Sequence, residues 1–172
     1  KEMMLKYEFA KKRLETEIEI LLKASEFKAG YNPVEHIKSR IKSYDSIVKK
    51  LERKGYDLTP DNVLRHVHDV VGLRIVCSFL SDVYDLINII KSSHQFIVKN
   101  ESDYIKNPKN SGYTSYHINV LIPVNLYAST EYIEAEIQIR TIAMDMWAIV
   151  ERNLRYKELL DDVFNLGLEL EK

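Results

Sequence analysis

Cysteine is almost absent from this 172-residue sequence: the single Cys77 lies inside the apolar run LRIVCSF. One cysteine excludes a disulfide within the chain and favours a cytoplasmic protein, in which Cys77 simply packs in a strand. The sequence also lacks any run of about 18 apolar residues, so we expect no membrane-spanning helix. The formal net charge is −1, which excludes the overall basic character of a general nucleic-acid binder.

Linkers, internal repeats and low-complexity segments are missing as well, and the composition is that of a globular protein, with 45% hydrophobic and 30% charged residues. The length suffices for one domain with a hydrophobic core. We therefore expect a single domain over 1–172. It comprises an N-terminal helical segment over 1–30, a core over 34–157 and a short acidic tail over 158–172.

Hydrophobic periodicity and capping residues predict ten elements, in the order helix, strand, helix, helix, strand, helix, strand, strand, strand, helix. Ser43, Thr59 and Thr141 are the expected caps of three helices. The expected helices cover 3–25, 44–54, 60–69, 81–93 and 142–157, and the expected strands cover 35–42, 70–79, 95–101, 114–124 and 131–141. This order predicts an α/β fold of the α+β mixed kind, with a mixed sheet of about five strands flanked by helices.

Three of the predicted strands carry polar side chains at every second position. In the last strand Ile133, Ala135, Ile137 and Ile139 alternate with charged and amide residues. A solvated face would explain one such strand, but three of them predict a polar cleft. The side chains expected to line the cleft are Arg40, Lys42, His117, Glu136 and Gln138.

Such a cleft suits a polyphosphate bound together with Mg²⁺. Basic residues on the strand over 35–42 lead directly into a capped helix, whose N-terminus offers free N–H donors to phosphate. Asp69 and Glu136 could share a Mg²⁺ ion, which commonly takes only one or two carboxylates. Tyr113 follows an Asn-Ser-Gly turn, and its ring either stacks on a base or belongs to the core.

Four segments carry a resemblance to a known family: SRIKSYDSIVKK, HDVVGLRIVCSF, DYIKNPKNSGYTSYH and EAEIQIRTIAMDMWAIVE. In this order they resemble the synthetase-domain motifs of the RelA/SpoT family, and in particular those of the small, single-domain alarmone synthetases. The resemblance covers roughly residues 34 to 157. It implies a nucleotidyltransferase-like fold for this catalytic core.

The resemblance implies an ATP-dependent pyrophosphokinase that transfers the β,γ-pyrophosphate of ATP to a ribose 3′-hydroxyl. The implied acceptor is GDP or GTP, which yields the alarmones (p)ppGpp. On the ATP side, the resemblance implies adenine binding for Arg40 and Arg74 and phosphate binding for Lys42, Ser46 and Lys50. It implies that Asp69 is an Mg²⁺ ligand and that Glu136 is a second carboxylate, which either binds the metal or activates the hydroxyl. On the acceptor side, it implies base stacking for Tyr113, phosphate binding for Lys109 and His117, and a place beside the ribose for Gln138.

Three positions depart from the family pattern, and they leave the acceptor open. Ser102 and Thr114 stand where the family often has a basic residue, and Arg152 follows Glu151 where the family has a histidine. Some toxin members of the family pyrophosphorylate the 3′-CCA end of tRNA, which has no 5′-polyphosphate to hold. The alternative function is therefore a translation-blocking toxin with tRNA as its acceptor and an antitoxin protein as its partner.

A run of three cations, Lys11, Lys12 and Arg13, lies on the first helix. These side chains form either a solvated helix face or a contact to the tRNA backbone. Small synthetases of the family also form homo-oligomers through a C-terminal helix, so a homo-oligomer is a further expectation from the resemblance.

Two readings from other classes compete with the synthetase. The segment HVHD, with His66, His68 and Asp69, could belong to a metal-dependent phosphohydrolase, but such a site needs an all-helical domain, and here a strand follows at once. The chain could also be an inactive nucleotide- or RNA-binding module. The presence of both carboxylates and of the basic residues favours the enzyme.

Overall fold

The structure is a computed structural model that describes residues 2–170, with side chains as far as residue 162. Within this range the elements follow the predicted order. They are α1 (Glu2–Ala29), β1 (Val34–Ile41), α2 (Tyr44–Lys54), α3 (Pro60–His66), β2 (Val71–Cys77), α4 (Leu80–Lys91), β3 (Ile97–Asp103), β4 (Tyr116–Leu126), β5 (Ser129–Thr141) and α5 (Ile142–Leu170).

The three predicted helix caps are confirmed. The Ser43 side chain accepts a hydrogen bond from the backbone N–H of Ser46, and Thr59 does the same for Asn62. The Thr141 hydroxyl accepts from the N–H of Met144 at 3.3 Å, at the start of α5. These caps determine where α2, α3 and α5 begin.

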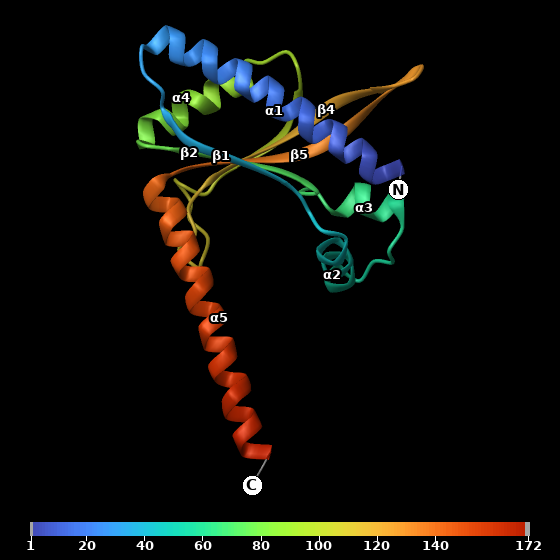
Figure 1. Cartoon of the computed structure of the whole chain (residues 1–172), viewed down its shortest axis with the longest axis vertical. Helices are drawn as coiled ribbons and strands as arrows, with labels where there is room; N and C mark the ends of the chain where they lie inside the picture. Colours follow the sequence, from blue (N-terminus) through green and yellow to red (C-terminus); the bar gives the residue numbers. More distant parts are fainter. Residues whose placement is uncertain (1, 171–172) are drawn as a thin grey trace.

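The five strands form one sheet in the order β1-β2-β5-β4-β3. Strands β2 and β5 run parallel and all other neighbours run antiparallel, so the predicted mixed sheet is confirmed. Helices α1 and α4 cover one face, whereas α5 and the α2–α3 pair stand on the other face (Figure 1). The predicted apolar residues of β5 are at most 3% exposed and face the core.

Helix α5 continues through the segment that the sequence suggested as a tail. It extends without a break from Ile142 to Leu170 and projects away from the sheet (Figure 1). Residues 158–170 contain five leucines and no proline, and leucine favours a helix. As far as Leu170, the expected tail is therefore the end of α5.

Cys77 is fully buried in β2, as predicted, and burial raises the pKa of its thiol to about 12. Its thiol therefore stays protonated and serves as a small apolar group. None of the described helices combines the length and the apolar character that crossing a membrane requires.

Candidate active site

Two rows of polar residues run across the face of the sheet that α1 and α4 leave uncovered. Strand pairing alone creates these rows, because residues in register on neighbouring strands point to the same side. The first row contains Lys38, Arg74, Gln138, His117 and Ser102. The second row contains Arg40, Gly72, Glu136, Asn119 and Asn100. The polar cleft predicted from strand alternation is therefore present.

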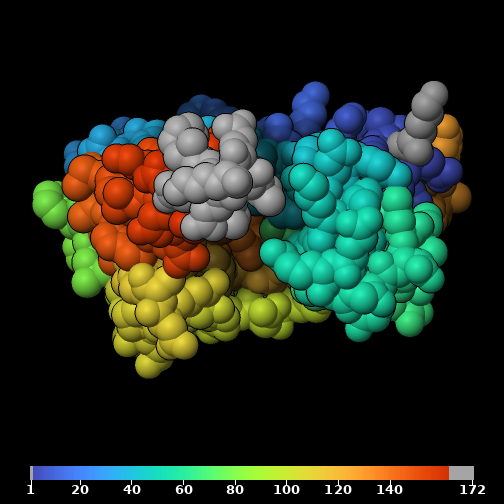
Figure 2. Space-filling view, turned by 90° about the horizontal axis from the view of Figure 1, so that it is seen from below, coloured from blue at the N-terminus to red at the C-terminus, as the bar shows by residue number. Residues whose placement is uncertain are grey.

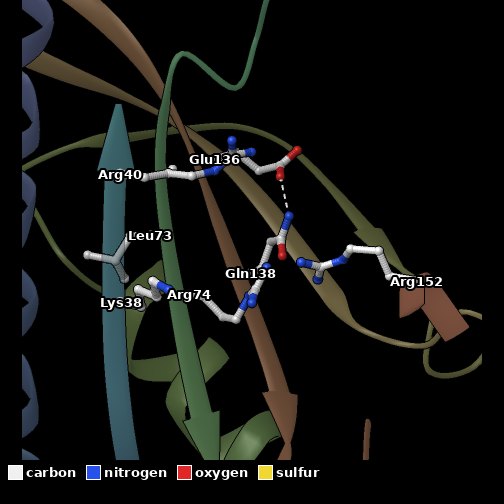
Figure 3. Close-up of a pocket in the computed structure, with 8 residues that line it drawn as sticks. Lys38, Arg40, Leu73, Arg74, Glu136, Gln138 and Arg152 are labelled. Atoms are coloured by element: carbon white, nitrogen blue, oxygen red, sulfur yellow. Dashed lines mark hydrogen bonds between the residues drawn. The ribbon is translucent and has the colours of Figure 1, made fainter. Parts of the chain in front are cut away.

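A first cavity, which we call the cationic cavity, has a volume of about 350 Å³. Its polar lining consists of Lys38, Arg40, Arg74, Arg152, Glu136 and Gln138 (Figure 3). Arg40 packs directly over Gly72 in the floor, because a Cβ at Gly72 would lie in van der Waals contact, 3.6 Å from the Arg40 Cγ and Nε atoms. Four cations around one carboxylate give this cavity an affinity for a polyanion.

Asp69 lies at the start of β2, between two lysines. The Nζ atom of Lys42 is 2.9 Å from its carboxylate and that of Lys50 is 2.7 Å away, while Arg40 approaches to 3.9 Å. Burial acts to raise the pKa of Asp69, but the hydrogen bonds from Lys50 and Lys42 outweigh it and lower the pKa to about 2. Asp69 is therefore ionised at any physiological pH.

A second cavity, the carboxylate cavity, has a volume of about 360 Å³ and is lined by both predicted metal ligands, Asp69 and Glu136. Figure 2 shows this side of the molecule, hollowed between α2 and α3 on one side and α5 with the β3–β4 loop (residues 104–115) on the other. Among the described residues, no three His, Cys, Asp or Glu side chains group as metal ligands. Two carboxylates nevertheless fit Mg²⁺, whose shell is usually completed by water and substrate phosphates.

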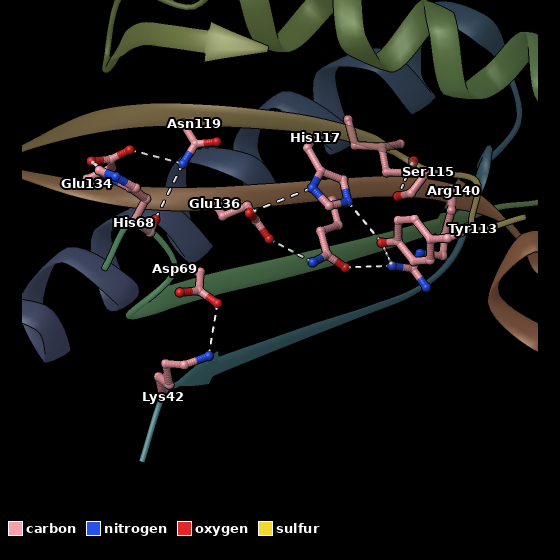
Figure 4. Close-up of polar contacts among 12 residues, drawn as sticks. Lys42, His68, Asp69, Tyr113, Ser115, His117, Asn119, Glu134, Glu136 and Arg140 are labelled. Carbon is pink, nitrogen blue, oxygen red and sulfur yellow. Dashed lines mark hydrogen bonds and ion pairs between the residues drawn. The ribbon is translucent and has the colours of Figure 1, made fainter. Parts of the chain in front are cut away.

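Glu136 belongs to a circuit of hydrogen-bonding side chains (Figure 4). Arg140 Nη2 donates to Gln138 Oε1 at 2.6 Å and to the Tyr113 hydroxyl at 2.7 Å. Gln138 Nε2 donates to Glu136 Oε1 at 2.7 Å, and the Tyr113 hydroxyl lies 2.9 Å from His117 Nε2. His117 Nδ1 faces Glu136 Oε2 at 3.7 Å, so the last contact of the circuit is longer than a hydrogen bond.

His117 is neutral in this circuit. Burial lowers its pKa from 6.5 to about 4, although the nearby Glu136 carboxylate acts in the opposite direction. Lys109, Arg140 and Arg74 add to the lowering, because each would repel an imidazolium. A neutral His117 accepts at one nitrogen and donates at the other.

The Tyr113 ring lines a third cavity of about 380 Å³, the tyrosine cavity, together with Arg74, Gln138 and Arg140. Gly112 brings the ring there: its φ of +86° is unfavourable for other residues, and a Cβ would lie 3.2 Å from Trp147 of α5. Lys109 Nζ lies 5.1 Å from the centre of the Tyr113 ring. The position of Tyr113 at a cavity, outside the core, fits the base-stacking alternative.

The structure does not bring every predicted residue to the cavities. Ser46 lies in the first turn of α2, where its hydroxyl accepts from the Ser43 hydroxyl, and it does not line any of the three cavities. The run at Lys11, Lys12 and Arg13 lies on α1, on the opposite face of the sheet (Figure 1). Lys11 pairs with Glu15 and Arg13 donates to the carbonyl of Pro123, so this run is not a continuous free patch.

The phosphohydrolase alternative finds no support in the geometry of the two histidines. His66 stacks on Tyr56 with ring centres 3.7 Å apart, and His68 Nδ1 lies 2.9 Å from Glu134. The Glu134 carboxylate also accepts hydrogen bonds from Lys99 at 2.8 Å and from Asn119 at 3.0 Å, so three side chains already contact it.

Sequence reasoning missed Arg140 and Arg152 as functional candidates. Strand alternation places Arg140 on the polar face, which was the available signal. Arg152 lies on α5 and reaches the cationic cavity from above the sheet (Figure 3). No local pattern in the sequence indicates that this helix crosses over the cleft.

Comparisons with known proteins agree with the geometry. The family model described as "Region found in RelA / SpoT proteins" matches residues 39–161. The chain is 46% identical to the GTP pyrophosphokinase YwaC of Bacillus subtilis (strain 168) over 157 residues, which are 91% of this chain and 75% of YwaC.

Two solved structures of the small alarmone synthetase 1 from Bacillus subtilis are also similar. The structure bound to its product pppGpp superposes with a TM-score of 0.80 at 33% identity, covering 90% of this chain and 78% of that one. The structure bound to AMPCPP gives a TM-score of 0.74 at 30% identity, covering 90% of this chain and 77% of that one.

Proposed function

This chain belongs to the RelA/SpoT family, and we propose from this membership that it transfers the β,γ-pyrophosphate of ATP to the 3′-hydroxyl of GDP or GTP. The relative YwaC is a GTP pyrophosphokinase. The small alarmone synthetase 1 binds pppGpp, a guanosine with phosphates at both 5′ and 3′ positions, and AMPCPP, an analogue of ATP. The chain is thus a pyrophosphokinase of the alarmone-forming kind.

One observation carries the proposal: Glu136 lines both the cationic cavity and the carboxylate cavity. A transferase for two nucleotides needs a polyanion site and an acceptor site that meet at one reactive group. Arg74 and Gln138 similarly line both the cationic and the tyrosine cavity, so all three spaces adjoin. ATP in the cationic cavity would present its phosphates to Glu136, and an acceptor on Tyr113 would present its ribose there.

The transfer forms one bond and breaks another. The acceptor 3′-oxygen attacks the β-phosphorus of ATP, the bond between this phosphorus and the α,β-bridging oxygen breaks, and AMP leaves. Glu136 is placed to take the proton of the 3′-hydroxyl. Asp69 and Glu136 would hold Mg²⁺, which supplies charge neutralisation for the phosphate oxygens.

The cations of the cleft account for the ATP side of the proposal. Arg40 and Arg74 extend from neighbouring strands into the cationic cavity, where two guanidinium planes can enclose adenine. Lys42 and Lys50 now neutralise Asp69, and the same ammonium groups can contact the transferred phosphates. We assign Ser46, in the first turn of α2, to the phosphates through that helix N-terminus.

The acceptor side depends on the β3–β4 loop. Tyr113 offers its ring to the guanine base, and Lys109, which lies over the same ring, is near enough to pair with acceptor phosphates. His117 and Gln138 are neighbours in register across β4 and β5, beside Glu136. His117 keeps its proposed contact to the acceptor phosphates, and the acceptor ribose would lie next to Gln138.

The tRNA acceptor stays an untested alternative that no observation favours. Its proposed contact, Lys11 to Arg13, lies on the face of the sheet opposite the three cavities, and two of these cations already have partners on the protein. An antitoxin partner would follow only if tRNA proved to be the acceptor.

A label-transfer assay tests the function. The protein is incubated with Mg²⁺ and ATP that carries a radioactive γ-phosphate, and GDP, GTP and deacylated tRNA are offered separately. We expect label in GDP or GTP together with release of AMP. Label in tRNA alone would replace the proposal with the toxin activity, and label in none of the three would leave an inactive binding module.

A further inference from the structure

We propose that Arg140 is a positioning residue, which holds Tyr113 and Glu136 in a fixed mutual arrangement through its hydrogen bonds to Tyr113 and Gln138. The inference rests on the proposed function, because it gives Tyr113 the acceptor base and Glu136 the reacting hydroxyl. Neither the family resemblance nor the predicted site residues assign a role to Arg140.

Burial of the Arg140 guanidinium carries a desolvation penalty that its partners in the structure must offset. The residue is 1% exposed, near the end of β5, and its Nε atom has no hydrogen-bond partner among the side chains and backbone that the structure describes. Its nearest carboxylate, on Asp145, is 3.6 Å from Nη1, and Asp145 is shared with Arg74. An apolar side chain at this position would fill the space without the desolvation penalty of a guanidinium. Core stability alone therefore does not explain an arginine here.

The two short hydrogen bonds from Nη2 explain the arginine better. A guanidinium can only donate, so Gln138 must accept with Oε1 and the Tyr113 hydroxyl must accept with its oxygen. The Gln138 amide is thereby oriented with Nε2 toward Glu136, to which it donates at 2.7 Å. The Tyr113 proton is left for His117 Nε2, at 2.9 Å.

The second branch reaches the same carboxylate. The Tyr113 hydroxyl contacts His117 Nε2, and the other ring nitrogen of His117 faces Glu136 Oε2 at 3.7 Å. Both branches that begin at Arg140 therefore lead to Glu136. Arg140 fixes the Tyr113 ring at one end and, through Gln138, orients the Glu136 carboxylate at the other (Figure 4).

Arg140→Met tests this role, because methionine fills similar space but donates no hydrogen bond. With the wild-type enzyme active on GDP, we expect Arg140→Met to raise the KM for GDP about tenfold and to lower kcat about tenfold, with the KM for ATP changed less than about twofold. Arg140→Lys keeps a donor-only cation and should recover part of both losses. Arg65→Met, at an exposed arginine of α3, is the matched control and should behave as wild type.

A double-mutant cycle asks whether Arg140 acts through Tyr113. Tyr113→Phe removes the hydroxyl that accepts from Arg140 and should raise the KM for GDP. If Arg140 acts through this hydroxyl, adding Arg140→Met to Tyr113→Phe should raise the KM for GDP less than about twofold further. Two fully multiplicative effects would overturn the inference.

Gln138→Leu removes the amide that links Arg140 to Glu136. If Arg140→Met does not fold, Gln138→Leu and Tyr113→Phe still test the two contacts through which Arg140 would act. Gln138→Leu should lower kcat with little change in the KM for ATP. Unchanged kinetics in Arg140→Met, or a KM for ATP that rises as much as that for GDP, would overturn the inference while leaving the proposed function in place. A wild-type protein without transfer to GDP or GTP would instead overturn the proposed function itself.

Discussion

Asp69 carries its negative charge between two ammonium groups, and a substitution there has two opposite consequences. Asp69→Asn removes one of two proposed Mg²⁺ ligands, so we expect kcat for pyrophosphate transfer to fall about 100-fold or more. The same change frees Lys42 and Lys50 from their carboxylate partner. ATP affinity, measured by calorimetry without an acceptor, should therefore stay equal or become tighter.

The control for this prediction is Asp61→Asn on α3, an exposed carboxylate paired only with Arg65. It should change neither kcat nor ATP affinity. A kcat of Asp69→Asn within about threefold of wild type would contradict the metal assignment, because loss of a ligand cannot leave the transfer step intact.

At the residue level, strand alternation was enough to place Glu136 and Gln138 in the cleft. The apolar positions of β5, such as Ile137, left no other face for them. Alternation could not show that Arg140, on the same face, would be fully buried, because its cover comes from α5 and the β3–β4 loop. Lys42, directly after β1, and Lys50 on α2 both pair with Asp69, and these contacts likewise join chain segments that are distant in sequence.

The β3–β4 loop presents Tyr113, and at Gly112 the backbone of this loop packs against Trp147 of α5. Gly112→Ala should strain the backbone at φ +86° and push the loop away from Trp147, whose ring would be 3.2 Å from the new Cβ. We expect a higher KM for the acceptor and an unchanged KM for ATP. Trp147 is the only tryptophan of the chain, so its fluorescence reports the displacement directly.

Gly55→Ala is a matched control for the loop. Gly55 has a similar φ of +77°, but a Cβ there meets nothing within 4 Å, and the residue ends α2, away from the tyrosine cavity. It should lower stability without changing acceptor kinetics or Trp147 emission. Equal effects of the two substitutions on the acceptor KM would show that backbone strain alone is responsible.

At the element level, the order and type of the helices and strands followed from local signals such as the caps at Ser43, Thr59 and Thr141. The strand order and the parallel pairing of β2 with β5 did not, since hydrogen bonds between strands distant in sequence determine them. The extent of α5 was also missed, because the acidic residues after 157 favour a tail. The two polar rows of the active site depend on this pairing between strands that are distant in sequence.

At the scale of the whole molecule, helix α5 carries a stripe of exposed apolar side chains. Ile142, Met146, Val150 and Leu154 recur every four residues and are between 46% and 62% exposed. Apolar side chains at this spacing on a projecting helix are stabilised by packing against another helix. We predict that a second copy of the chain covers the stripe, so sedimentation velocity should show an oligomer. Val150→Glu with Leu154→Glu should yield monomers, whereas Leu64→Glu on α3 should not.

Acid should destabilise the whole fold in two separate steps. His117 has a pKa of about 4 when folded and 6.5 ordinarily, so the unfolded chain binds a proton first as pH falls below 6.5. Folding stability is complete above that pH and declines toward pH 4, by about 3 kcal/mol at about 1.4 kcal/mol per pKa unit. Asp69, with a pKa lowered from 3.8 to about 2, adds a further loss only below 3.8.

The first step can be isolated by urea unfolding at about pH 7.5 and about pH 5, since Asp69 is ionised in both states at both values. We expect a lower free energy of unfolding at the lower pH. His117→Asn should reduce this difference even if it lowers stability overall, because asparagine has no proton to gain. His94→Asn, at an exposed position, should retain it. An unchanged difference in His117→Asn would show that other groups cause the acid sensitivity and that His117 is not held neutral by the fold.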